Sequence, residues 1–267
     1  MPKTEDFSFY QLEMKAPKKA ELQIYNVIGK DWYSDGSTVE AKKFINDLKA
    51  LGELDELEIR INSPGGSVYE GMAIFNVLKQ HSAKKTVYID GIAASMASIL
   101  AMLGDPVIMP GNTMMMIHNP MIFAGGDARK FRKQAETLDK WKENILAIYT
   151  DKSGQDKAKL SQMMDDETWL TAKECLDLGL CDEVIAPVKI AAVAGLEHLQ
   201  NVPPEIVSYM NTTGESSEMP KELTLEILKA EHPELVATLK NELKADFEKE
   251  PKNQSATPDA IKEAVKQ

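Results

Sequence analysis

The chain has 267 residues, 43% of them hydrophobic and 27% charged, a balance typical of a globular protein that can bury a sizeable core. Its 42 acidic and 31 basic residues give a net charge of −11, which argues against a nucleic-acid backbone as the main partner, because phosphate binding needs clustered Lys and Arg. The two cysteines are too few for a disulfide framework and form no metal-binding pattern with histidine. The sequence indicates neither a metal nor an organic cofactor.

No segment reaches the roughly 18 apolar residues that span a bilayer. The longest apolar tract, residues 92–103, is short and is interrupted by Ser95 and Ser98. The N-terminus lacks the apolar region of a secretory signal. We therefore expect a cytoplasmic protein without a membrane partner.

Strand and helix patterns alternate between residues 21 and 185. In chain order, the predicted strands are 21–28, 57–61, 86–89, 107–109, 114–118 and 182–185. The predicted helices are one that opens at the capping box Ser37-Thr38-Val39-Glu40, one that ends near Lys79, 93–103, 127 to about 149, and a short one within 170–180. Gly91 is expected to break the strand at 86–89. This alternation predicts an α/β layer fold built from βαβ-like units.

Ser95 is a candidate nucleophile because it lies where a strand passes into a helix, between small residues. A hydroxyl in the first turn of a helix lies beside free N–H groups that can stabilise an oxyanion. Taken alone, a serine at such a position is more commonly a helix N-cap or a packed small residue.

His118 ends an apolar strand at a point where a rigid scaffold presents reactive groups to a loop. An imidazole is the usual base for activating a serine hydroxyl, although a lone histidine in this pattern is more commonly a hydrogen-bonded residue of the core. The turn Asn62-Ser63-Pro64-Gly65-Gly66 could point backbone amides at a ligand, or it could be only a tight turn. A phosphate-binding loop is disfavoured because no Lys-Ser/Thr pair and no G-x-G-x-x-G pattern accompanies it.

Taken together and in order, four segments resemble the signature segments of the ClpP peptidase family. They are Ile61-Asn62-Ser63-Pro64-Gly65-Gly66, Ala93-Ala94-Ser95-Met96, Met116-Ile117-His118-Asn119-Pro120 and Glu167-Thr168-Trp169-Leu170-Thr171-Ala172. The resemblance implies a crotonase-like spiral of βαβ units that assembles into a homo-oligomeric ring and cleaves polypeptides. It also implies that the helix from Asp127 packs one ring on another, although its apolar stripe would suit ordinary core packing equally well.

The resemblance assigns a role to each site residue. Ser95 matches the nucleophile, His118 matches the general base, and the amides of Gly66 and Met96 match the oxyanion hole. The position of the triad acid falls on Glu167, where most family members carry aspartate. Glutamate can orient an imidazole, but Asp166 could serve instead, and both could simply belong to an exposed acidic patch that caps the next helix.

The resemblance covers about residues 20–187, and it divides the chain into four parts. An N-terminal extension (1–19) precedes the ClpP-like peptidase domain (20–187), and a linker (188–218) leads to a charged, helical and partly disordered tail (219–267) that could be a scaffold-like segment. The tail and the Glu-Thr-Trp segment look like those of phage and prophage head maturation proteases. Processing of capsid or scaffold proteins, in the bacterial cytoplasm or within assembling proheads, is therefore the expected function.

Other functions stay open on the sequence. A ClpP-like proteolytic subunit that works with a host ATPase unfoldase would carry the same site. A catalytically silent assembly protein or a crotonase-type acyl-CoA enzyme would use the same architecture, although the paired Ser95 and His118 disfavour the acyl-CoA enzyme.

Overall fold

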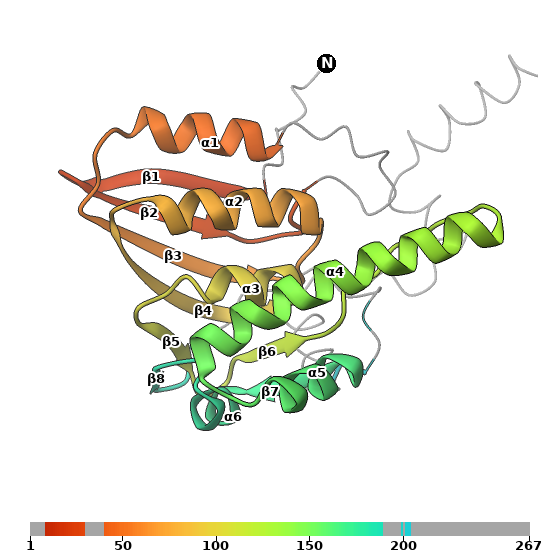
Figure 1. Cartoon of the computed structure of the whole chain (residues 1–267). Coiled ribbons are helices and arrows are strands. Elements are labelled where there is room, and N and C mark those ends of the chain that lie inside the picture. The colour runs from red at the N-terminus through yellow and green to blue at the C-terminus, as the bar shows by residue number, and fades with distance from the viewer. Residues whose placement is uncertain (1–8, 30–39, 189–198, 200, 204–267) are drawn as a thin grey trace, which may run out of the picture. The chain divides into compact units, whose positions relative to one another are not determined.

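The computed structural model describes residues 9–29, 40–188, 199 and 201–203 (Figure 1). The tail at 219–267 lies wholly, and the linker at 188–218 largely, outside the described residues, as do the first residues of the predicted capping box. These parts of the domain prediction therefore stay predictions. Within the described ranges, no helix combines the length and the apolar character needed to cross a membrane.

The described residues form one sheet of eight strands, with the neighbour order β1-β2-β3-β4-β5-β8. The strands are β1 (Tyr10–Ala16), β2 (Lys19–Ile24), β3 (Glu56–Ser63), β4 (Lys84–Ala94), β5 (Val107–Pro110), β6 (Met114–Ile117), β7 (Thr168–Thr171) and β8 (Glu183–Ile185). Pairing from β2 through β3, β4 and β5 to β8 is parallel, whereas β1 pairs with β2 in antiparallel fashion. Parallel strands connected through helices confirm the predicted α/β class.

Strand β4 is the branch point of the sheet. Its Val87 and Tyr88 pair with β5, whereas its last residues, Ile92–Ala94, pair with Met114–Met116 of β6. Strand β6 in turn pairs with β7 in antiparallel register. The branch therefore places the ends of β4 and β6, and the start of β7, in one region.

Six helices accompany the sheet in the described part of the chain. They are α1 (Glu40–Ala50), α2 (Val68–Gln80), α3 (Met96–Ala101), α4 (Ala128–Ser153), α5 (Lys157–Asp165) and α6 (Ala172–Leu178). Figure 1 shows α1, α2 and α3 in succession along the sheet, with α4 running past α3. Local signals set the ends of α4, since the Asp127 side chain accepts from the Lys130 amide and Gly154 ends the helix in a left-handed conformation.

The core is formed mainly by alternate residues of the central strands and by the helix faces that cover them. Ile59 and Ile61 of β3 and Val87 and Ile89 of β4 are fully buried. A smaller apolar cluster supports the branch, where Ile92, Ala94, Met116 and Leu199 pack together. The strands that carry the candidate site are therefore packed on both faces.

Helix α4 is buried only in its C-terminal half. Its buried residues are Ile145, Leu146 and Tyr149, whereas Phe131 in the first turns is 48% exposed. In Figure 1 the N-terminal half extends past the neighbouring elements. Core packing therefore explains the end of the predicted apolar stripe but not its beginning.

The prediction that Gly91 breaks its strand is wrong, because β4 continues through Gly91 to Ala94. Pairing of Ile92–Ala94 with β6 extends the strand past the glycine. The helix expected from residue 93 consequently begins only at Met96. The sequence analysis also missed β1, β7 and α5, whose short or mostly exposed segments carry weak apolar periodicity.

Candidate active site

Ser95 lies at the sharp turn between β4 and α3. Its backbone has φ 54° and ψ −125°, a conformation that is rare for a residue with a side chain and that costs of order 1–3 kcal/mol. The amide of Ser95 donates to the Met116 carbonyl over 3.0 Å. The Ser95 side chain makes no capping hydrogen bond with α3, so its hydroxyl is not occupied as a helix cap.

His118 comes directly after β6, the strand that pairs with the end of β4. Its Nε2 lies 2.7 Å from the Ser95 Oγ, which is hydrogen-bond distance. The side chain is only 10% exposed, and burial lowers the pKa of His118 to about 4. The imidazole is therefore neutral at pH 7, which is the form that accepts a proton.

The carboxylate beside the imidazole belongs to Glu167. Its Oε2 lies 3.8 Å from the His118 Nδ1, a distance longer than a hydrogen bond but close enough for charge attraction. Glu167 itself has φ 49°, in the turn between α5 and β7. The neighbouring Asp166 carboxylate instead accepts from the Gln162 side-chain amide over 3.0 and 3.1 Å at the exposed end of α5.

The glycine turn packs directly against Ser95. Gly65 and Gly66 have φ values of 94° and 147°, which favour glycine. A Cβ on Gly65 would lie 2.7 Å from the Ser95 Cβ and 2.9 Å from the Met96 nitrogen, and a Cβ on Gly66 would lie 2.2 Å from the Ile28 oxygen. Both positions therefore require glycine, whereas the sequence analysis assigned an individual role only to Gly66 of this turn.

Two backbone amides near Ser95 are candidates for oxyanion binding. Met96 is the first residue of α3, where an amide has no partner within its own helix. Gly66 forms a parallel bridge to Ile28 in which the Ile28 amide donates to the Gly65 oxygen over 2.7 Å and the Ser67 amide donates to the Ile28 oxygen over 2.8 Å, so the Gly66 amide takes no part in the bridge. No described residue accepts a hydrogen bond from the amide of either Met96 or Gly66.

A polar cluster ties the loop after His118 to two helices. The Asp165 carboxylate accepts from the Asn119 side-chain amide over 2.6 Å and from the Lys142 ammonium over 2.5 Å. These two donors hold the pKa of Asp165 below its usual range. Asn119 adjoins His118, and Asp165 comes two residues before Glu167. The cluster therefore links the segment that carries His118 to the segment that carries Glu167. Sequence reasoning missed it because its members lie up to 46 residues apart.

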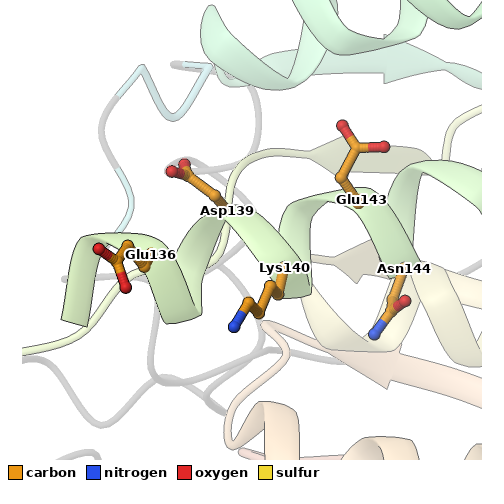
Figure 2. Close-up of a pocket in the computed structure, with 5 residues that line it drawn as sticks. All are labelled: Glu136, Asp139, Lys140, Glu143 and Asn144. Carbon is orange, nitrogen blue, oxygen red and sulfur yellow. The ribbon is translucent and has the colours of Figure 1, made fainter. Parts of the chain in front are cut away.

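A separate surface hollow lies along α4 (Figure 2). Its lining consists of Glu136, Asp139, Lys140, Glu143 and Asn144. All of these residues come from one helix at spacings that share one face. The lining includes neither Ser95 nor His118, so we assign the hollow no part in the candidate site.

Comparison with known proteins agrees with the geometry. The family model described as Clp protease matches residues 32–188, more than half of the chain. An ATP-dependent Clp protease proteolytic subunit 1 from Protochlamydia amoebophila is 36% identical over 129 residues, which cover 47% of this chain and 63% of the relative. The subunit 1 from Chlamydia abortus is 31% identical over 156 residues (57% and 81%), and the proteolytic subunit from Bacteroides fragilis is 36% identical over 152 residues (56% and 72%). The chain therefore belongs to the Clp protease family.

Proposed function

We propose that this chain is a serine endopeptidase in which Ser95 is the nucleophile, His118 the general base and Glu167 the acid that orients the base. The observation that carries the proposal is the 2.7 Å contact between the Ser95 hydroxyl and the His118 Nε2. Nucleophilic serines are activated by a base at this distance, with a third group behind the base.

The proposed reaction uses these groups in turn. As the Ser95 oxygen attacks a peptide carbonyl, its proton passes to the His118 Nε2, and the imidazolium that forms is stabilised by the Glu167 carboxylate behind Nδ1. The amides of Gly66 and Met96 donate to the oxyanion. His118 then gives the proton to the leaving amine, and water activated by the same imidazole releases the acyl group from Ser95.

The test is a comparison of the whole chain with its Ser95→Ala variant. We expect the native chain to hydrolyse an unfolded protein substrate such as labelled casein, and to bind a fluorophosphonate probe at Ser95 alone. We expect the variant to lose several orders of magnitude in turnover and all labelling, with an unchanged far-ultraviolet circular dichroism spectrum. Ser153→Ala is the matched control, because it removes a hydroxyl that bonds only within the α4 region. Unchanged turnover in Ser95→Ala would remove the assignment.

One biological setting is supported by the names of the relatives. They are proteolytic subunits of ATP-dependent Clp proteases. By analogy, we propose a homo-oligomeric peptidase that receives polypeptides from an ATPase unfoldase. In a reconstituted reaction with the host unfoldase, degradation of a folded substrate should require ATP and Ser95.

Features outside this likeness support a second setting, the maturation of phage capsids. Glu167 stands where most family members carry aspartate, and residues 189–267 extend beyond the matched region. Co-expression with candidate capsid and scaffold proteins distinguishes the two settings. Cleavage that requires Ser95 but no ATPase would favour capsid maturation, whereas intact capsid and scaffold proteins beside ATP-dependent degradation would favour the unfoldase-linked subunit.

A further inference from the structure

A buried chain of hydroxyl groups leads from α4 to the backbone of Ser95. The Tyr149 hydroxyl lies 2.7 Å from the Ser98 Oγ, and the Ser98 Oγ lies 2.5 Å from the Ser95 carbonyl oxygen. Tyr149 is 1% exposed and Ser98 is fully buried, so water does not compete for these bonds.

The direction of each hydrogen bond follows from the number of protons. A serine hydroxyl has one proton, and a carbonyl oxygen can only accept. Ser98 must therefore donate its proton to Ser95, and so it accepts the proton of Tyr149. Burial raises the pKa of Tyr149, which keeps that proton in place at all working pH values.

The chain of bonds acts on a residue whose backbone has a conformation that is rare for a residue with a side chain. The Ser95 carbonyl accepts from both the Ser98 hydroxyl and the Ser98 amide, over 2.5 and 3.0 Å, while the Ser95 amide donates to Met116. A serine hydroxyl that bonds a carbonyl one turn back is ordinary inside a helix. In this protein, however, a second and fully buried hydroxyl fixes the direction of that bond, and it comes from another helix, 51 residues away. Such an arrangement is not ordinary.

We propose that Ser98 and Tyr149 are positioning residues that hold the Ser95 backbone at φ 54°, so that its hydroxyl points at His118. The inference rests on the proposed role of Ser95 as the nucleophile. Neither residue touches substrate. Their effect is on the angle at which the Ser95 oxygen approaches a carbonyl, where a displacement of about 1 Å can cost a factor of about 100 in rate.

The experiment measures fluorophosphonate labelling and peptide turnover in the full chain and in Ser98→Ala, Tyr149→Phe and the double variant. We expect each single variant to be labelled about tenfold more slowly while reaching the native final extent of labelling, and to lose kcat with KM nearly unchanged. Because Tyr149 acts only through Ser98, adding Tyr149→Phe to Ser98→Ala should cause no further loss. Matched controls are Thr137→Ala, which removes an exposed hydroxyl bonded only to the Lys133 carbonyl of α4, and Tyr25→Phe, which removes a tyrosine hydroxyl bonded to Asp90 rather than to the buried chain of hydroxyl groups.

Three results would overturn the inference. The first is a labelling rate in the single variants within about twofold of that of the native chain, and the second is a loss of activity in the double variant equal to the product of the two single losses. The third is a lower final extent of labelling reached at the native rate, which would indicate a structural role alone. If Ser98→Ala does not fold, Tyr149→Phe decides the matter, since it removes a single oxygen atom. Labelling of the native chain that persists in Ser95→Ala would instead refute the proposed function, and the positioning role with it.

Discussion

Replacing Glu167 with glutamine tests which carboxylate completes the site. The Glu167 Oε2 is 3.8 Å from the His118 Nδ1, and the two side chains are 14% and 10% exposed, so an effective dielectric constant near 20 is appropriate. At that distance the carboxylate stabilises an imidazolium by about 4 kcal/mol. Glutamine keeps the shape but loses the charge, and we therefore expect kcat to fall by about three orders of magnitude.

The assay is steady-state peptide hydrolysis, with thermal unfolding as the check on folding. Asp166→Asn is the matched control, because it removes a neighbouring carboxylate that accepts from Gln162 at the exposed end of α5. We expect it to change kcat by no more than about twofold. If Glu167→Gln kept near-native kcat while Asp166→Asn lost it, the Glu167 carboxylate would not stabilise the imidazolium, and Asp166 would be the acid.

Two further predictions follow from the geometry around Ser95. Gly65→Ala should abolish labelling and lower the melting temperature, because Gly65 has φ 94° and the new Cβ would lie within 3 Å of backbone and side-chain atoms of residues 94–96. The control Gly125→Ala should change neither, since Gly125 has open space around it. Native labelling and melting temperature in Gly65→Ala would show that this position does not require glycine. Since burial lowers the pKa of His118 to about 4, kcat/KM should stay high as the pH falls below 6.5 and should be lost only near pH 4, where the protonated imidazole can no longer accept a proton. An acid limb at 6.5 in the rate profile would contradict this prediction, and would show that the attraction of the Glu167 carboxylate offsets the effect of burial on the imidazole.

Local patterns were enough to predict the α/β class and to select Ser95, His118 and the glycine turn as candidates. Each signal is short-range: apolar alternation marks strands, and paired glycines mark a turn. The same local reasoning failed at Gly91, where a glycine is expected to end a strand. Pairing of Ile92–Ala94 with β6 outweighs the preference of one residue, and that pairing joins segments some 22 residues apart.

Long-range contacts were decided only by the tertiary structure. The sequence left Glu167 and Asp166 as alternatives, because two neighbouring acidic residues cannot be told apart by sequence pattern although their side chains point in different directions. The turn after α5 directs the Glu167 side chain toward the imidazole and leaves Asp166 in contact with Gln162. No local signal connects Tyr149 with Ser98, since their contact depends on how α4 crosses α3. Residue type and spacing can identify which groups are able to react, whereas sheet register and helix packing determine which of them meet.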